Sequence, residues 1–377
     1  MKPFWASHRF SGKIFKGGFL KLIAMSKIWI EILTPKQVMM FGRLARELEK
    51  EHELLITTRE YKETNELLEL KGISAEVVGK HGGGTLEGKL IASIERTEKL
   101  SQLVQAEKPN VLVSLASPEA SRVAFGLKIP HVCINDIPEA EAVARLTAPL
   151  ATLIVTPKLI PKEVWQKYGV QKERIVQYDA LDPVAWLKGF KPNNEVLELL
   201  KIKKGKPTVT FRTEEIFAAY LANKVSGSSS LVLPIVNELM EKIDANFIVL
   251  PRYREQDETI SQLLNGRAFI PHHAIDGPSL LHYSDIFIGS GGTMTLESAL
   301  LGTPTISCRP FNTMYENYAV KKGLIIKADS TNATKKALGI IHKNSSYKKK
   351  LGKKAAQLVE RMEDPIKVIK SVLQKFV

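Results

Sequence analysis

The segment SDIFIGSGGTMTLESALLGTP, residues 284–304, constrains the architecture of this 377-residue chain more than any other. Its apolar run at 286–288 is typical of a buried strand, and the glycines between 289 and 292 are typical of a tight turn. The residues that follow predict a short helix that ends near Gly302. A strand, a glycine turn and the start of a helix together favour anion binding, because free backbone N–H groups meet there.

The length and composition of the chain indicate a globular protein with two domains. Its 377 residues exceed what one ordinary hydrophobic core holds, and 44% of them are hydrophobic while 25% are charged. Cys133 and Cys308 stand in or directly after apolar runs, which predicts buried thiols rather than a disulfide or metal ligands. Free thiols fit a reducing compartment, so we expect a cytoplasmic protein.

The chain is strongly basic, with a formal charge of +14 at pH 7. This charge predicts attraction to a polyanion or to an anionic membrane surface and does not distinguish the two. No stacking platform or basic recognition helix stands out, so no nucleic-acid partner is expected. The octapeptide YKKKLGKK at 347–354 favours weak peripheral binding at the inner face of the cell membrane. A solvated basic helix, or the Lys-rich composition of a heat-adapted protein, explains it equally well.

Short β-rich runs alternate with amphipathic segments from Lys27 onward, which predicts parallel sheets with helices on both faces. The expected strands are KIWIEIL, HELLITT, SAEVVG, NVLVSLA, HVCIN and TLIVT in the first domain and TVTFR, NFIVLPR, RAFIP, DIFIG and PTISC in the second. Helices are expected at 38–50, at 88–106 and in the carboxyl-terminal segment, where Pro365 marks a break. The expected divisions are an amino-terminal extension (1–26), a first domain (27–187), a linker (188–206), a second domain (207–345) and a carboxyl-terminal helical segment (346–377).

The amino-terminal extension is basic and is interrupted by glycines. It lacks the long apolar core of a signal peptide or a membrane span. Two interpretations stay open: an interfacial anchor, or an upstream start codon, since MSKIWIEIL beginning at Met25 already opens an ordinary first strand.

The glycine turn has room for both the diphosphate and the ribose of a nucleotide. Thr293 is predicted to cap the helix, which puts Glu297 in the first turn. The carboxylate of Glu297 has two acceptor oxygens and no donor, which suits the two hydroxyls of a ribose. The alternative is that Glu297 only complements the helix dipole, for about 0.3–1 kcal/mol, and that the glycines only make a turn.

The spacing of Ser290, Gly291, Glu297, Gly302 and Pro304 resembles the nucleotide-sugar motif of GT-B glycosyltransferases, especially the lipid-linked N-acetylglucosaminyl transferases of cell-wall synthesis. It also resembles the UDP-N-acetylglucosamine 2-epimerases, which share the architecture. Along nearly the whole chain, the motifs GKHGG, VLPR and GGTM are similar to those of a largely archaeal family of unassigned function within this group. The resemblance implies an α/β fold of two Rossmann-like, doubly wound domains in GT-B arrangement, with an interdomain cleft and a last helix that crosses back to the first domain.

The resemblance also implies which residues bind the nucleoside-diphosphate sugar. The diphosphate would lie on the turn, and Glu297 would hold the ribose; the turn residues are Ser290, Gly291, Gly292 and Thr293.

Two arginines are further candidate phosphate ligands, because a guanidinium binds phosphate oxygens in pairs. Arg212 stands where the epimerases carry an Arg-containing loop, and Arg252 ends another strand on the same side. Surface ion pairs with nearby acidic residues are the alternative for both, since Glu214, Glu215 and Glu255 are their neighbours in the sequence.

Sugar transfer needs a general base from the first domain, at the carboxyl end of a strand. His81 follows the third expected strand, Glu119 the fourth and Asp136 the fifth. By the resemblance, Asp136 stands where the epimerases carry a catalytic Glu. Asp136 and His81 are the favoured catalytic residues, because Pro118 makes Glu119 a first-turn helix residue.

Other polar residues allow less specific interpretations. Thr34 and Lys36, after the first strand, are weak candidates for contact with the donor or acceptor and are expected to be solvated. Glu141 and Arg145 match a helix of the epimerases or simply pair with each other, being four residues apart. No metal or other cofactor is expected. The spacing of the three histidines before the glycine turn, His272, His273 and His282, matches no standard metal site.

The favoured function is metal-independent transfer of a sugar from a nucleoside diphosphate, with a UDP-sugar preferred. By resemblance, the acceptor is lipid-linked and is met at an anionic membrane surface. A sugar-nucleotide epimerase and a non-catalytic sugar-nucleotide binding protein are the alternatives. The chain departs from both families, since LASPEAS after the fourth strand lacks the epimerases' Asp and ILTPKQ after the first lacks the transferases' glycines.

Overall fold

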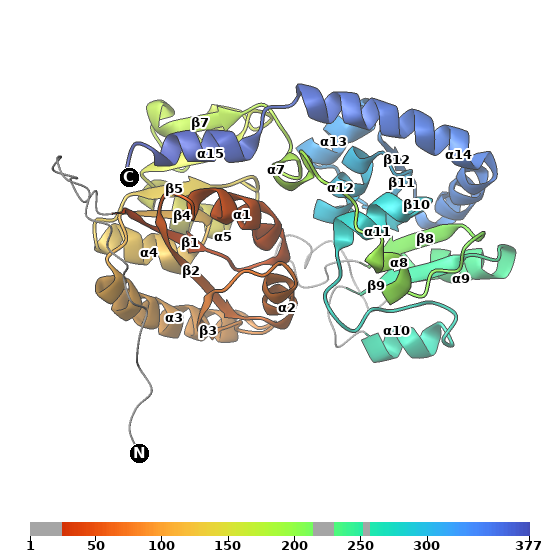
Figure 1. The fold of residues 1–377 in the computed structure, drawn as a ribbon, viewed down its shortest axis with the longest axis horizontal. Coiled ribbons are helices and arrows are strands. Elements are labelled where there is room, and N and C mark those ends of the chain that lie inside the picture. Colours follow the sequence, from red (N-terminus) through yellow and green to blue (C-terminus); the bar gives the residue numbers. More distant parts are fainter. Residues whose placement is uncertain (1–24, 214–229, 252–256) are drawn as a thin grey trace, which may run out of the picture.

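Two parallel sheets organise the computed structural model of the chain (Figure 1). The structure describes residues 25–213, 230–251 and 257–377. The strand order is β3-β2-β1-β4-β5-β6-β7 in the first sheet and β12-β11-β10-β8-β9 in the second. The expected α/β fold, with parallel sheets in two domains, is therefore confirmed.

The elements follow the alternation that the sequence predicts. The strands are β1 (Lys27–Glu31), β2 (Glu53–Glu60), β3 (Glu76–Lys80), β4 (Val111–Leu115), β5 (His131–Ile134), β6 (Leu153–Pro157), β7 (Ile175–Tyr178), β8 (Thr208–Arg212), β9 (Asn246–Leu250), β10 (Ile286–Gly289), β11 (Thr305–Ser307) and β12 (Ile325–Lys327). The helices are α1 (Pro35–Leu48), α2 (Lys62–Leu70), α3 (Leu86–Glu107), α4 (Pro118–Gly126), α5 (Glu141–Thr147), α6 (Lys162–Gln166), α7 (Val184–Leu187), α8 (Glu195–Leu199), α9 (Leu233–Lys242), α10 (Asp257–Leu263), α11 (Gly277–Tyr283), α12 (Thr293–Leu301), α13 (Met314–Lys321), α14 (Ser330–Arg361) and α15 (Pro365–Leu373).

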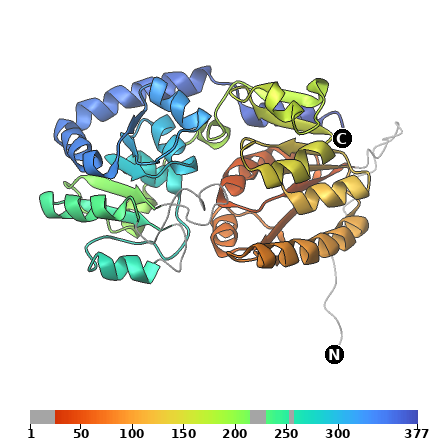
Figure 2. The same cartoon turned by 180° about the vertical axis from the view of Figure 1, so that it is seen from behind.

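Strand β1 shows why both faces of the first sheet are covered. Ile28 and Ile30 pack in one hydrophobic cluster with residues of α1 and α15, whereas Trp29 packs in another with residues of α3 and α4. Figures 1 and 2, seen from opposite sides, show helices on both faces of the sheet. A strand that is buried on both faces needs a continuous apolar run, which is the pattern that predicts a parallel sheet.

A buried ion pair lies at the carboxyl end of β1. The guanidinium of Arg96, on α3, is 2.6 Å from Glu31, and both side chains are almost wholly inaccessible to solvent. Glu31 also accepts hydrogen bonds from Thr57 on β2 and from Ser117 before α4. Arg96 donates from Nε to the carbonyl of Val78 on β3, at 2.8 Å. This network joins three strands to two helices.

The structure has elements that the sequence-based expectation missed. Strands β7 and β12 were not expected; both are edge strands of three or four residues, too short for a strong periodic signal. The expected strand RAFIP contributes only a single bridge, between Ile248 and Phe269. The expected linker contains α8, whose Val196 packs with Leu250 and Leu280 of the second domain.

The last helix, α15, packs on α1 and α7. Arg43 of α1 holds it there, because Nη2 lies 2.6 Å from Oδ2 of Asp364, the residue that caps α15. The chain therefore passes between the two domains twice, before α8 and between α14 and α15 (Figure 1).

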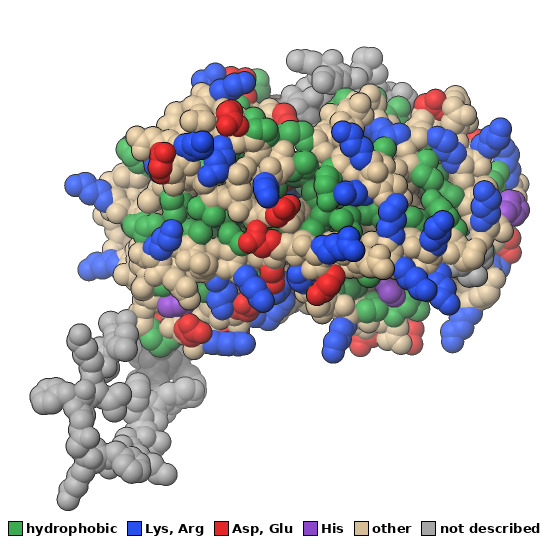
Figure 3. All heavy atoms as spheres, turned by 90° about the horizontal axis from the view of Figure 1, so that it is seen from above, with side chains coloured by type: hydrophobic (Ala, Val, Ile, Leu, Met, Phe, Trp, Pro, Cys, Tyr) green, Lys and Arg blue, Asp and Glu red, His purple; other side chains and the backbone are tan. Residues whose placement is uncertain are grey.

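The basic octapeptide at 347–354 is part of α14, and Figure 3 shows Lys and Arg side chains spread over the face that carries this helix. Not all of its lysines are free to meet a lipid surface. Lys348 donates to the carbonyls of His282 and Ser284, at 2.9 and 2.7 Å. Burial lowers the pKa of Lys348. Among the described helices, none is long and apolar enough to cross a bilayer.

Gly302→Ala should destabilise the protein strongly, because Gly302 ends α12 with a φ of 77° and a Cβ there would lie 2.3 Å from Cα of Gly352 in α14. The left-handed backbone alone costs an alanine about 1–2 kcal/mol, and the backbone clash adds to this. Gly352→Ala is the matched control: nothing lies within 4 Å of its Cβ, and alanine in a helix gains about 0.5–1 kcal/mol over glycine. Equal urea-unfolding free energies for the two variants would contradict this packing.

Candidate functional site

The carboxyl ends of the two sheets are joined by hydrogen bonds between the domains. Tyr315 on α13 donates from its hydroxyl to the carbonyl of Asp136, after β5, at 2.6 Å. Trp186 on α7 donates from Nε1 to Oε1 of Glu297 on α12, at 2.7 Å. Ligands of open α/β sheets bind at this edge of the strands, so the junction is the candidate site.

The glycine turn after β10 needs glycine at two positions. Gly291 and Gly292 have φ angles of 88° and 87°, in the region that other residues rarely adopt. Gly292 precedes the first helical residue of α12, and no side chain caps the helix. The prediction that Thr293 caps α12 is therefore wrong, because the positive φ of Gly292 lets the helix begin at Thr293 itself. The uncapped N–H groups of the first turn are available to an anion.

Two described arginines lie near this turn. Arg212 ends β8, beside β10, and donates from Nη1 to the carbonyl of Pro251 at 2.8 Å. Arg309, two residues after the end of β11, packs against the turn, since a Cβ at Gly291 would lie 2.7 Å from its Cδ. Arg309 was not predicted as a ligand, although its place after the strand PTISC was a usable signal. The predicted ligand Arg252 lies outside the described residues.

Glu297 lies deeper than a first-turn residue. It is the fifth residue of α12, so the first turn contains no acidic residue and the helix-dipole interpretation is wrong. Its side chain is buried, with 4% of the residue exposed, against Trp186. Burial raises the pKa of Glu297 to about 7, while the hydrogen bond from Trp186 and the charge of Arg212 oppose the shift. The contact with Trp186 had no signal in the sequence.

Glu297→Gln should weaken nucleotide binding if Glu297 holds the ribose. The loss of a charge-assisted hydrogen bond should make the free energy of binding less favourable by about 1.5–3 kcal/mol. Calorimetric titration with UDP measures this change. Trp186→Phe is the control, because it removes the indole donor, keeps an aromatic ring and leaves the carboxylate; it should bind UDP nearly as well as the wild type. Unchanged UDP affinity in Glu297→Gln would contradict the ribose assignment.

Asp136 belongs to a buried charged network. Nζ of Lys36 lies 2.5 Å from Oδ2 of Asp136 and 2.6 Å from Oδ2 of Asp182. The hydroxyl of Tyr178 donates to the other oxygen of Asp182 at 2.6 Å. The expectation that Lys36 is solvated is wrong, because two carboxylates hold it inside. They raise its pKa although burial acts in the opposite direction.

The electrostatics of Asp136 suit a proton acceptor. Burial and, to a smaller extent, the charge of Asp182 raise the pKa of Asp136, Lys36 opposes both, and the resulting pKa is about 7. Oδ1 of Asp136 is buried and has no hydrogen-bond partner within the described part of the chain. A carboxylate that titrates near neutral pH and has one free oxygen is able to take a proton from a reacting hydroxyl.

His81 is placed differently. Its Nδ1 accepts the N–H of Gly83 at 3.2 Å, and its ring packs on that of Tyr61 with centroids 4.9 Å apart. Burial lowers its pKa, and the charges of Arg59 and Lys89 lower it further. A neutral histidine whose Nδ1 accepts carries its proton on Nε2, so this nitrogen is a donor. We therefore favour Asp136 over His81 as the base.

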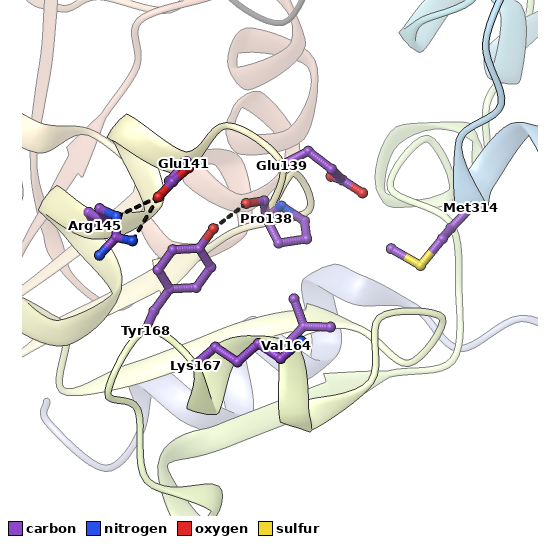
Figure 4. Close-up of a pocket in the computed structure, with 8 residues that line it drawn as sticks. All are labelled: Pro138, Glu139, Glu141, Arg145, Val164, Lys167, Tyr168 and Met314. Carbon is purple, nitrogen blue, oxygen red and sulfur yellow. Dashed lines mark hydrogen bonds and ion pairs between the residues drawn. The ribbon is translucent and has the colours of Figure 1, made fainter.

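A pocket of about 410 Å³ lies beside the loop that follows Asp136 (Figure 4). Arg145 pairs with Glu141 at 2.7 Å, as their four-residue spacing allows. The hydroxyl of Tyr168 donates to the carbonyl of Pro138 at 2.8 Å. The pocket is lined by Pro138, Glu139, Glu141, Arg145, Val164, Lys167, Tyr168 and Met314.

The fold is shared with solved structures of a UDP-GlcNAc 2-epimerase and of a glycosyltransferase. The UDP-GlcNAc 2-epimerase from Neisseria meningitidis, bound to UDP-GlcNAc, superposes with a TM-score of 0.70 and 18% identity, over 93% of this chain and 100% of that chain. The spinosyn forosaminyltransferase SpnP superposes with a TM-score of 0.60 and 14% identity, over 94% of this chain and 99% of that chain. At these identities the likeness establishes the GT-B fold alone.

The sequence itself has a closer relative. The uncharacterized protein MJ0665 of Methanocaldococcus jannaschii is 34% identical over 345 residues, which cover 90% of this chain and 95% of that protein. This archaeal relative fits the largely archaeal family that the motifs indicate. Residues 26–375 match the model of one family, and the chain therefore belongs to the family described as "Protein of unknown function (DUF354)".

Proposed function

We propose that this protein transfers a sugar from a nucleoside diphosphate, with a UDP-sugar preferred, to a hydroxyl group of an acceptor. One observation carries the proposal: Asp136, a carboxylate with a raised pKa and a free buried oxygen, lies at the carboxyl end of the first sheet. Tyr315 joins its backbone to the domain that contains the glycine turn. A base and an anion site thus belong to the two sides of one junction.

The donor's diphosphate would lie on the turn at residues 290–293. The uncapped N–H groups of α12 and the guanidinium groups of Arg212 and Arg309 supply positive character there. These fixed groups can balance the charge of the leaving diphosphate, so the transfer is proposed to be metal-independent. The Neisseria epimerase with the same fold is bound to UDP-GlcNAc, which supports a nucleotide sugar as the ligand.

The proposed reaction is a single displacement. Asp136 takes the proton of the acceptor hydroxyl, and the hydroxyl oxygen forms a bond to the anomeric carbon of the sugar. The bond from that carbon to the diphosphate oxygen breaks, and its electron pair leaves with the nucleoside diphosphate. Since the base is active when ionised, the rate should rise with pH through about 7, the pKa of Asp136.

An epimerase is the second candidate, because the Neisseria 2-epimerase is covered over its whole length with a TM-score of 0.70. The loop after β4 weakens this candidate. It contains no Asp, and the hydroxyl of Ser117 in this loop donates to the buried carboxylate of Glu31 at 3.1 Å.

Incubation with UDP-GlcNAc, followed by NMR of the products, separates the candidates. Transfer predicts an unchanged sugar nucleotide when the protein acts on it alone, and UDP release when prenyl phosphates or phosphorylated sugars are added as acceptors. Formation of the C2 epimer without any acceptor would contradict transfer and establish the second candidate. If neither incubation gives a product, transfer is contradicted as well, and the remaining candidate is a non-catalytic sugar-nucleotide binding protein.

A further inference from the structure

Three side chains of the first domain are in contact at the carboxyl edge of its sheet. Arg59 lies near the end of β2, Tyr61 directly follows β2, and His81 directly follows β3. The Arg59 guanidinium carbon is 5.9 Å from the centroid of the Tyr61 ring, and the rings of Tyr61 and His81 are 4.9 Å apart. The N–H of His81 continues the ladder by donating to the carbonyl of Glu60 at 3.0 Å. This edge is the one that also carries Asp136.

The guanidinium of Arg59 has unused donors. Within the described residues it makes no ion pair or hydrogen bond, and its Nε is buried without a partner. The carboxylates near it are already engaged, since Glu31 pairs with Arg96 and Glu119 accepts a hydrogen bond from Ser117 at 3.4 Å. A partly buried guanidinium without an acceptor is costly in the free protein, and an anionic ligand would remove that cost.

His81 adds a second donor beside Arg59. Its Nδ1 accepts from Gly83, so the proton of the neutral ring is on Nε2. The loop is held in place by close backbone contact, because a Cβ at Gly82 would lie 2.4 Å from the carbonyl oxygen of Gly88 in α3. The donors of Arg59 and His81 therefore belong to a fixed part of the fold.

We propose that Arg59, Tyr61 and His81 form a binding site for a phosphate group of the acceptor. The inference rests on the proposed function, since sugar transfer is what defines the acceptor. A guanidinium fork binds two phosphate oxygens, and an imidazole N–H binds a third. The donor's diphosphate has its own site on the second domain, so the phosphate on the first domain belongs to the acceptor.

Two kinds of acceptor share this chemistry: a phosphorylated sugar and a phosphorylated lipid. The helix that follows the loop, α3, exposes apolar side chains beside it, with Leu86 at 85%, Leu90 at 61% and Ile94 at 59% exposure. A phosphate that carries an apolar chain is therefore one of the ligands to be tested.

The test is calorimetric titration with inorganic phosphate, glucose 1-phosphate and farnesyl phosphate, with UDP as a separate ligand. Arg59→Gln should weaken binding of the phosphorylated probes about ten- to a hundredfold and leave UDP affinity unchanged. Lys62→Gln, which removes one positive charge from an exposed neighbouring residue, is the matched control and should change the phosphate affinities less than about twofold. His81→Gln should weaken the same probes and provides a second variant if Arg59→Gln does not fold.

The stronger of the two organic probes identifies the source of the phosphate, and either preference supports the site. If the wild type binds UDP but none of the phosphates, or if Arg59→Gln and His81→Gln bind them normally, the acceptor site is refuted while the donor proposal stands. Absence of UDP binding to the wild type would instead refute the proposed function, and with it this inference.

Discussion

Asp136→Asn is expected to lower the rate of sugar transfer about a hundred- to ten-thousand-fold, the usual effect of losing a general base. The amide keeps the shape of the side chain and an oxygen for Lys36, which lies 2.5 Å from Oδ2 in the wild type. It does not accept a proton at neutral pH, so only the chemical step should suffer. The measurement is kcat with saturating UDP-sugar, together with UDP affinity, which should stay unchanged.

Asp182→Asn is the control, because Asp182 pairs with the same lysine at 2.6 Å. It should reduce kcat far less than Asp136→Asn. The negative charge of Asp182 raises the pKa of Asp136, so its removal should lower that pKa and move the acidic limb of the pH–rate profile to lower pH. Equal losses in the two variants would show that the network supports structure only. Near-normal turnover in Asp136→Asn would refute the mechanism.

Arg96→Met should lower the free energy of unfolding by about 3–5 kcal/mol. Arg96 is 2.6 Å from Glu31, and removing the cation leaves a carboxylate buried among Thr57 and Ser117 without its ion-pair partner. Urea unfolding, followed by circular dichroism, measures the change. The effect is large for a protein whose total stability is of the order of 5–15 kcal/mol.

The double variant Glu31→Gln with Arg96→Met tests the cause of this loss. Its neutral amide still accepts hydrogen bonds from Thr57 and Ser117, so most of the stability should return. If the double variant is as unstable as Arg96→Met alone, lost packing of the long side chain explains the effect instead of the uncompensated charge. Wild-type stability in the single variant would show that the pair contributes nothing.

The fold was largely predictable because its strongest signals are local. Continuous apolar strands such as β1 and β10, the glycines of the turn, and Pro365 at the first position of the last helix are recognised from neighbouring residues alone. Strands β7 and β12 lie at sheet edges and are three or four residues long, so they provide too few residues for a periodic signal.

The candidate site was predictable only in part. The glycines of the turn and the place of Asp136 after β5 are local features. Lys36 and Asp136 are 100 residues apart, and Trp186 and Glu297 are 111 apart, so the first contact depends on packing within the first domain and the second on how the two domains pack. That packing turned an expected solvated lysine into a buried ion pair, and an expected first-turn glutamate into a buried one.

Thermal unfolding in the presence of increasing UDP and UDP-GlcNAc tests the central claim, that the junction binds a nucleotide sugar, most directly. A ligand that binds only the folded state stabilises it by about 2.7 kcal/mol at a hundred times its Kd. The account predicts that Tm rises with the logarithm of the UDP concentration, and that UDP-GlcNAc has an effect at least as large. A Tm that stays constant with both ligands at millimolar concentrations would contradict the account.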